Sequence, residues 1–155
     1  MYAIFHNIRS LYNVGSMFRT ADAAGVSTIY LTGYTPSPVD RFGHVRSEIA
    51  KTALGAEHTV LWEKKQDIAA LLRKLQVEGV FVVGLEQHPH ALDYRRVRPQ
   101  KKWALVAGNE VRGLSEAVLR KCDVIAEIPM HGKKESLNVS VAFGIALFEI
   151  GRAHV

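Results

Sequence analysis

Short apolar runs alternate with segments of helical periodicity along the whole chain. Runs rich in β-branched and aliphatic residues predict strands at Tyr2–Phe5, Thr28–Leu31, Thr59–Trp62, Val80–Leu85, Trp103–Ala107 and Val124–Ile128. Several of these runs are apolar at successive positions, which is typical of parallel strands that are covered on both faces. The pattern predicts an α/β fold with a mostly parallel sheet and helices on both faces.

Two segments between these runs repeat apolar residues at spacings of three and four, as amphipathic helices do. In the first helix, we expect Asn13 to cap the start and Gly25 to end the helix in a left-handed conformation. The second helix carries the apolar stripe Ile68–Leu75, and we expect Gly79 to close it.

A last helix is predicted after Ser136, and it runs to about Arg152. Its apolar residues cover so much of the circumference that we expect it to be largely buried, against the sheet or against a partner subunit. Asn138 and Ser140 lie in its first turn and would need polar partners there, unless they only satisfy local backbone groups.

The composition is that of a globular protein. The chain has 155 residues, of which 48% are hydrophobic and 23% charged, and we expect a single domain spanning residues 1–155. One cysteine, Cys122, excludes an intrachain disulfide and thiolate metal clusters. The start of the chain has no signal-like apolar segment, and no apolar run reaches the ~20 residues of a membrane-spanning helix. We therefore expect a cytoplasmic protein with no membrane partner.

The usual signatures of phosphate-binding and covalent enzymes are missing. No G-x-G-x-x-G follows the first run, Gly108–Gly113 lacks the Lys-Ser/Thr of a P-loop, and no G-x-S-x-G elbow occurs. His88, His90 and His131 could supply imidazoles to a metal, but they come without convergent carboxylates or further cysteines. We expect neither a nicotinamide or P-loop enzyme nor a metal site.

Three segments place glycines and polar residues where strands are followed by ligand-binding loops. They are Asn13–Gly25, which contains Arg19; Ala104–Ser115, which contains Glu110; and Ile128–Ala142. Taken singly, each segment also fits a helix cap, a surface charge or an ordinary turn.

Together, and in this order, the three segments resemble the SpoU branch of the SPOUT class of RNA methyltransferases. The patterns N-x-G-x-x-x-R-x-A-x-x-x-G, G-N-E-x-x-G-L and I-P-M…S-L-N-V-S-x-A are all present, and the likeness covers essentially the full chain. It implies a SPOUT-type α/β knot with a C-terminal deep trefoil knot, and a homodimer. It also implies transfer of a methyl group from S-adenosylmethionine to a ribose 2′-hydroxyl of RNA, without a metal.

The resemblance also implies which residues carry the chemistry. The family's cofactor loops match Val83, Gly84, Gly108, Asn109, Ile128, Met130, Ser136, Leu137 and Asn138. The family assigns removal of the hydroxyl proton to Arg19, assisted by Asn13. Because a guanidinium stays protonated in proteins, we expect Arg19 to bind a phosphate and stabilise the developing alkoxide, while Asn13 and Glu110 hold it in place.

The net charge of +5 suggests a polyanionic partner, although a merely solubilising basic surface is the alternative. If the partner is RNA, the expected phosphate contacts are Arg9, Arg41, Arg46, Arg95, Arg96 and Arg98. Short family members without an N-terminal RNA-binding extension include tRNA wobble-position enzymes, so tRNA is the first expectation. Ribosomal RNA is the alternative substrate, and a catalytically idle RNA-binding module is the competing hypothesis.

Overall fold

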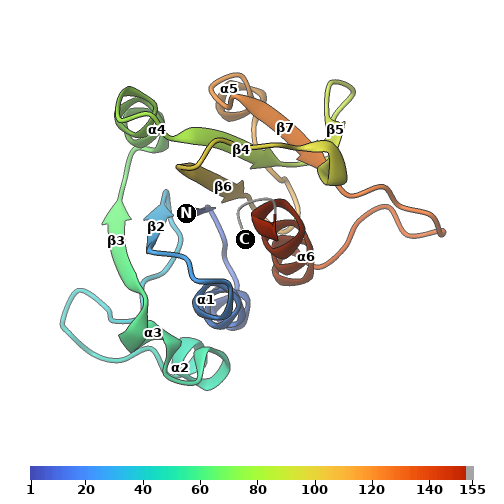
Figure 1. Ribbon diagram of the computed structural model, residues 1–155. Coiled ribbons are helices and arrows are strands. Elements are labelled where there is room, and N and C mark those ends of the chain that lie inside the picture. Colours follow the sequence, from blue (N-terminus) through green and yellow to red (C-terminus); the bar gives the residue numbers. More distant parts are fainter. Residues whose placement is uncertain (153–155) are drawn as a thin grey trace.

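The computed structural model describes residues 1–152, which form a seven-stranded sheet flanked by helices (Figure 1). The strands are β1 (Tyr2–His6), β2 (Thr28–Thr32), β3 (Leu61–Lys65), β4 (Phe81–Leu85), β5 (Leu92–Asp93), β6 (Trp103–Ala107) and β7 (Val124–Glu127). All neighbouring strands are parallel, in the order β3-β2-β1-β6-β4-β7-β5. The predicted α/β fold with a parallel sheet is confirmed.

The helices lie on both faces of this sheet, as expected. They are α1 (Leu11–Ala24), α2 (Ser47–Ala53), α3 (Ala56–Thr59), α4 (Ile68–Val77), α5 (Glu116–Leu119) and α6 (Val139–Gly151), with a 3-10 turn, η1, at Tyr94–Arg96. In Figure 1, α1 and α6 cover one face, while α4 and α5 cover the other. Residues of β1 alternate accordingly: Ala3 and Phe5 belong to the core under α1 and α6, and Ile4 belongs to the core under α4 and α5.

The packing of α1 against α6 brings the starts of these two helices to the same edge of the sheet. The Phe5 ring of β1 makes edge-on contacts with Phe18 of α1 and Phe143 of α6, with ring centroids 6.0 and 5.2 Å apart. On its other side α1 packs closely on α2, because a Cβ at Gly15 would lie 2.3 Å from the Ile49 carbonyl oxygen. These contacts fix the position of α1.

The start of α1 differs from the prediction. The helix begins at Leu11 with Ser10 as its cap, and the Ser10 Oγ accepts a hydrogen bond from the Asn13 N–H at 3.2 Å. The expectation that Asn13 caps the helix is therefore wrong, and its side chain is available for other partners. Gly25 ends α1 in the left-handed region at φ +81°, as predicted.

The last helix also starts later than predicted. Asn138, and not Ser136, caps α6, and its Oδ1 accepts a hydrogen bond from the Ser140 N–H at 2.9 Å. Only one side of α6 is buried, because Val141, Ile145 and Phe148 are 48%, 38% and 53% exposed. No helix within residues 1–152 is both long and apolar enough to cross a bilayer.

The remaining differences lie in short elements. Residues 56–59 form the helical turn α3, so β3 begins at Leu61 and the strand expected from Thr59 is displaced by two residues. The segments α2, α5, η1 and β5 carry no periodicity long enough to predict them. Gly79 follows α4 with φ +83°, as expected for a closing glycine.

Candidate active site

A pocket lies at the carboxyl ends of β4, β6 and β7, where ligand sites of parallel sheets are found. It is lined by Leu85, Glu86, Gln87, Ala107, Gly108, Asn109, Glu110, Val111, Gly113, Glu127, Ile128, Met130, Ser136, Leu137, Val139 and Ala142. Among these described residues there are three glutamates and no Lys, Arg or His. Much of the remaining wall is apolar, so the pocket is suited to a ligand with an apolar or aromatic part and a positive charge.

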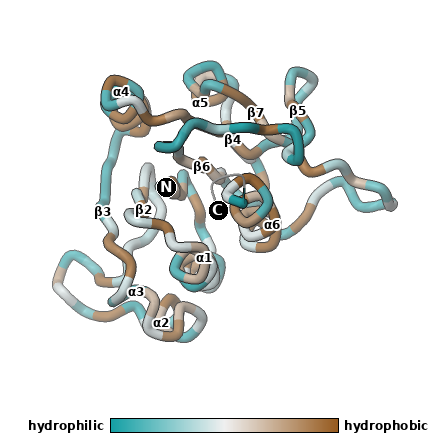
Figure 2. Tube along the Cα trace, in the orientation of Figure 1, coloured by the Kyte–Doolittle hydropathy of each residue, from teal (hydrophilic) through white to brown (hydrophobic). Residues whose placement is uncertain are grey.

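Most of the residues expected to bind a cofactor meet in this pocket. Gly108 and Asn109 come from the loop after β6, while Ile128, Met130, Ser136 and Leu137 come from the segment between β7 and α6. That segment extends away from the sheet before it returns to α6 (Figure 1), and the tip of this extension is hydrophilic (Figure 2).

Three residues of the expected set lie outside the pocket lining. Val83 is buried within β4, and a Cβ at Gly84 would lie 2.9 Å from Cys122 Sγ. Leu85, Glu86 and Gln87 line the pocket instead, because β4 extends beyond Gly84 before it reaches the edge. Asn138 lies beside the pocket at the start of α6.

Two glycines shape the pocket floor. A Cβ at Gly108 would lie 2.7 Å from Leu114 Cδ2, so the loop after β6 can fold back only because this side chain is absent. Gly113 has φ +66°, and a Cβ there would lie 1.8 Å from Glu86 Oε2. Asn109 completes the turn, since its Oδ1 accepts hydrogen bonds from the Val111 and Arg112 N–H groups at 2.9 and 2.8 Å.

Glu86 is a pocket residue that the sequence motifs did not identify. Its Oε2 accepts a hydrogen bond from the Leu114 N–H, and its Oε1 accepts one from the Gln87 N–H, each at 2.9 Å. The carboxylate therefore joins the loop after β4 to the loop after β6. The only signal in the sequence was its place directly after an apolar strand.

A hydrogen-bonded chain of side chains joins all three sequence segments beside the pocket. Glu110 Oε2 accepts a hydrogen bond from Asn13 Nδ2 at 3.2 Å, and Asn13 Oδ1 accepts one from Asn138 Nδ2 at 3.3 Å. The Asn138 Oδ1 in turn caps α6. Residues about a hundred positions apart in sequence are thus linked at one corner of the pocket.

The Glu110 carboxylate also caps the entry to α1. Its Oε1 accepts a hydrogen bond from the Arg9 N–H at 3.0 Å, and its Oε2 accepts one from the Ser10 N–H at 2.8 Å. Partial burial raises the pKa of Glu110, but the hydrogen bonds from Arg9, Ser10 and Asn13 outweigh burial, and the net pKa is lowered. Glu110 is therefore a carboxylate at neutral pH, with its oxygens occupied by donors.

Arg19 lies apart from this chain of side chains. It is exposed on α1, six residues beyond Asn13, which is about 9 Å along a helix axis. No hydrogen bond or ion pair joins it to Asn13 or Glu110 within the described residues 1–152. The expectation that these two residues hold Arg19 is not met within one chain, because they hold each other.

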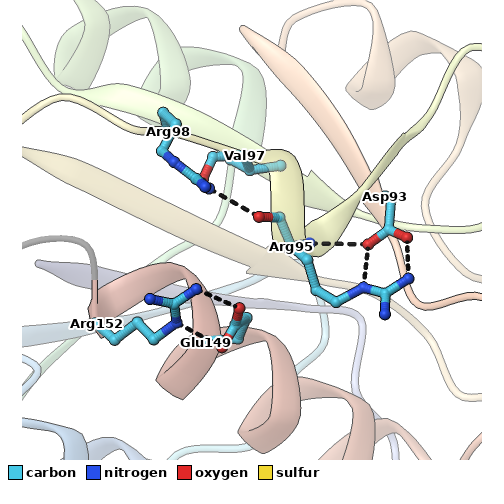
Figure 3. A network of polar contacts seen from close by, with 6 residues as sticks. All are labelled: Asp93, Arg95, Val97, Arg98, Glu149 and Arg152. Atoms are coloured by element: carbon cyan, nitrogen blue, oxygen red, sulfur yellow. Dashed lines mark hydrogen bonds and ion pairs between the residues drawn. The ribbon is translucent and has the colours of Figure 1, made fainter.

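The arginines expected to contact RNA are spread over several loops, and two of them already have partners. Asp93 accepts two hydrogen bonds from the Arg95 guanidinium, one of them at 2.9 Å from Nε, while the Nη1 of Arg98 donates to the Arg95 carbonyl oxygen at 2.8 Å (Figure 3). Glu149 of α6 and Arg152, which directly follows this helix, form a second ion pair in this region (Figure 3). Arg95 and Arg152 are thus paired with carboxylates, whereas Arg96 and Arg98 have no ion pair within residues 1–152.

The other three expected arginines lie in the segments that precede α1 and α2. Arg9 precedes α1, and the Arg41 guanidinium lies 4.8 Å from the centre of the Phe42 ring in the loop between β2 and α2. Arg46 directly precedes α2.

Of the three histidines considered as metal ligands, His88 has hydrogen-bonded ring nitrogens. His88 Nε2 lies 2.8 Å from Glu116 Oε1, and His88 Nδ1 accepts a hydrogen bond from the His90 N–H at 3.1 Å. No group of three or more His, Cys, Asp or Glu side chains within residues 1–152 is arranged to hold a metal ion.

Comparison with known proteins agrees with the fold. Residues 1–148 match the model of the SpoU rRNA Methylase family. The chain is 36% identical over 149 residues to the 23S rRNA (guanosine-2′-O-)-methyltransferase RlmB of Ralstonia nicotianae, covering 96% of this chain and 57% of that protein. The chain thus belongs to the SpoU rRNA Methylase family, and it spans a little over half the length of this relative.

Solved structures show the same similarity. The AdoMet-bound rRNA methyltransferase of Sinorhizobium meliloti superimposes with a TM-score of 0.89 at 32% identity, over 99% of this chain and 56% of the other. A TrmH/SpoU tRNA modifying enzyme of A. aeolicus gives a TM-score of 0.85 at 28% identity, over 98% of this chain and 74% of the other.

Proposed function

We propose that this chain binds S-adenosylmethionine in the pocket and methylates a ribose 2′-hydroxyl of RNA. The observation that carries the proposal is the linkage of the three segments through Asn13, Glu110 and Asn138, directly beside the pocket. An idle RNA-binding module would need neither this linkage nor a pocket shaped by Gly108 and Gly113.

The pocket residues fit S-adenosylmethionine in charge and shape. This cofactor carries no phosphate, and the described lining has no cationic side chain to bind one. The carboxylates of Glu86, Glu110 and Glu127 would instead favour a positively charged ligand. The missing side chains at Gly108 and Gly113 let Leu114 and Glu86 pack against the loop after β6, which shapes the pocket. Ile128 and Leu137 would contact the adenosyl group.

The protein's task in this reaction is alignment and charge stabilisation. When bound, S-adenosylmethionine supplies an activated methyl group. Glu110 and Asn13 fix the start of α1 against the loop after β6, which holds the helix and the pocket loop in one relative position. Arg19 would bind an RNA phosphate and stabilise the negative charge that develops on the 2′-oxygen.

We further infer that Arg19 serves the pocket of a second copy in a homodimer. Within one chain Arg19 is exposed, and nothing directs it to the pocket. The exposed stripe of Val141, Ile145 and Phe148 on α6 is apolar, and α6 packs beside α1, so a second copy could cover both helices.

Mixing two inactive variants tests this arrangement. Arg19→Ala removes the guanidinium, and Gly113→Ala obstructs the pocket. If Arg19 acts on the partner's pocket, each heterodimer of the two variants has one intact site out of two. Random mixing makes half of the dimers heterodimers, so the mixture should regain about a quarter of wild-type activity. A mixture that stays inactive would show that Arg19 acts within its own chain.

Ribosomal RNA is the substrate that the relatives favour. The Ralstonia relative is named for 23S rRNA and the Sinorhizobium structure for rRNA, so the sequence-based preference for tRNA gives way to the alternative. The A. aeolicus structure, described as a tRNA modifying enzyme, keeps tRNA as the second candidate.

The basic residues around η1 would contact RNA phosphates. Because Arg95 is paired with Asp93 while Arg96 has no ion pair within residues 1–152, we propose that Arg96 contributes more to RNA binding. Arg96→Ala should weaken binding and lower the slope of log affinity against log salt by about one, and Arg95→Ala should change it less.

We also infer the remaining architectural features from the family resemblance. A single domain over residues 1–155, a deep trefoil knot and a cytoplasmic location are proposals.

Calorimetry with S-adenosylmethionine, followed by mass spectrometry of nucleosides, tests the proposed function. We expect binding to the wild-type chain and a 2′-O-methylated nucleoside that is missing from the RNA of a deletion strain. Absence of cofactor binding together with retained RNA binding would favour the idle module.

A further inference from the structure

Tyr34 presents a half-exposed aromatic ring next to the pocket. It follows β2 at the same edge of the sheet, and it is 55% exposed. Its hydroxyl accepts a hydrogen bond from Asn109 Nδ2 at 2.9 Å, and Asn109 lines the pocket. An exposed ring in this place has no role in the core.

The turn that carries Tyr34 is fastened from several sides. Asn7 has φ +56°, and its Oδ1 accepts a hydrogen bond from the Tyr34 N–H at 3.1 Å. At Gly33, where φ is +60°, a Cβ would lie 1.8 Å from that same Oδ1. A non-glycine residue in the left-handed region persists only where its surroundings hold it. The ring is thus kept in an exposed position and does not fold onto the surface.

Lys64 adds a further restraint and a positive charge. Its Nζ donates hydrogen bonds to the Gly33 carbonyl oxygen, at 2.9 Å, and to the Thr35 carbonyl oxygen. Burial, and to a smaller extent the charge of Arg46, lowers the pKa of Lys64. The Nε of Arg46 is buried and has no hydrogen-bond partner within residues 1–152.

An aromatic ring with neighbouring cations fits the chemistry of a nucleotide. Unpaired bases stack on aromatic side chains, and the attached phosphates are bound by Lys and Arg. In a duplex the faces of the bases are covered by their neighbours, so only an unpaired base can use the ring.

We propose that the Tyr34 ring stacks on an unpaired RNA base that flanks the methylated nucleotide. This assignment rests on the proposed function and deepens it, since it makes a single-stranded or looped RNA the substrate class. Tyr34 is then a positioning residue for RNA and does not touch the transferred methyl group.

Two variants of Tyr34 separate the ring from its hydroxyl. Tyr34→Ala removes both, whereas Tyr34→Phe keeps the ring and loses only the hydrogen bond to Asn109. Val77→Ala, an 84% exposed apolar side chain on α4, serves as the control truncation.

Binding is measured by fluorescence anisotropy with two probes, an RNA hairpin with an unpaired loop and a fully paired RNA duplex of the same composition. Tyr34→Ala should weaken hairpin binding by between about 5-fold and about 150-fold, the range found for base-stacking aromatics. Duplex binding should change by less than about twofold, and Tyr34→Phe and Val77→Ala should stay within about threefold for both probes. With a methylatable RNA, Tyr34→Ala should raise KM and leave kcat nearly unchanged.

Each other outcome overturns the assignment. Unchanged hairpin binding by Tyr34→Ala excludes stacking, and equal losses in Tyr34→Ala and Tyr34→Phe assign the effect to the Asn109 hydrogen bond. Equal losses for hairpin and duplex would indicate a general phosphate contact. A failure of the proposed function looks different, because the wild-type chain would then not bind S-adenosylmethionine.

Discussion

Replacing Glu110 by Gln should destabilise the protein, because this carboxylate joins the loop after β6 to the start of α1. It accepts hydrogen bonds from the Arg9 and Ser10 N–H groups and from Asn13 Nδ2. A hydrogen bond to a charged group contributes about 1.5–3 kcal/mol when shielded, but these groups are partly exposed, so we expect a total loss of about 1–2 kcal/mol. With a urea m-value of about 2 kcal/mol/M, the midpoint should fall by about 0.5–1 M.

The pH dependence of this loss has a defined sign. Because hydrogen bonding holds the pKa of Glu110 below its usual value of 4.5 in the folded protein, its stabilisation is complete above that value. The stabilisation is lost as the pH falls through the folded-state pKa, so the gap between wild type and Glu110→Gln should narrow as the pH is lowered below the usual value of 4.5.

Urea unfolding at fixed protein concentration, at neutral and acidic pH, measures both effects. Glu48→Gln is a matched control, because Glu48 lies in the first turn of α2 and its carboxylate has no hydrogen bond within residues 1–152. It should cost no more than about 0.5 kcal/mol. A Glu110→Gln midpoint equal to that of wild type, or a gap that stays constant at pH 3, would refute the role assigned to the carboxylate.

Two further predictions concern the pocket and the thiol of Cys122. Gly113→Ala should abolish binding of S-adenosylmethionine in calorimetry, because its Cβ would collide with Glu86. Gly79→Ala is the control, since Gly79 has a similar φ but no atom within 4 Å of the added Cβ. It should lower the free energy of unfolding by only about 1–2 kcal/mol and leave binding intact. Burial, together with the charge of Asp123, raises the pKa of Cys122 to about 12. A thiol reagent at about pH 8 should therefore modify the native protein far more slowly than the urea-unfolded chain. Equal rates of modification would contradict this prediction.

The sheet could be predicted from the sequence because its signal is local. Parallel strands covered on both faces are continuous apolar runs, and Trp103–Ala107 is buried at every position, within the bounds that its sequence predicted. The short elements could not be predicted in this way. Helical turns such as α3, with four residues, are stabilised by their tertiary surroundings and leave no periodic pattern.

The helix caps show where local signals become ambiguous. Ser10 and Asn13 are both good capping residues, and the sequence alone does not decide between them. The structure selects Ser10, which frees Asn13 to bond with Glu110 and Asn138, two residues far away along the chain. The sequence identified Asn13 as significant but could not reveal its partners.

The sequence also predicted part of the site. Motif residues such as Gly108, Ile128 and Leu137 meet in the pocket, since strand ends at one edge of a parallel sheet bring successive loops together. Glu86 lies outside the motifs, and its bond to the Leu114 N–H depends on a contact between two loops. The sequence motifs did not show that Arg19 lies apart from the pocket of its own chain, because its distance from that pocket depends on how the elements pack.

The polar contacts around the pocket couple its formation to the position of α1. Glu86 holds the loop after β6 from one side, and Glu110 holds the same loop to α1 from the other. A ligand that orders this loop would therefore also fix the position of the helix that carries Arg19, even if the ligand itself contacts only the loop. The pocket and the proposed catalytic guanidinium lie apart within one chain. They are nevertheless connected, because hydrogen bonds join the pocket loop to the start of α1 and the helix itself extends from there to Arg19.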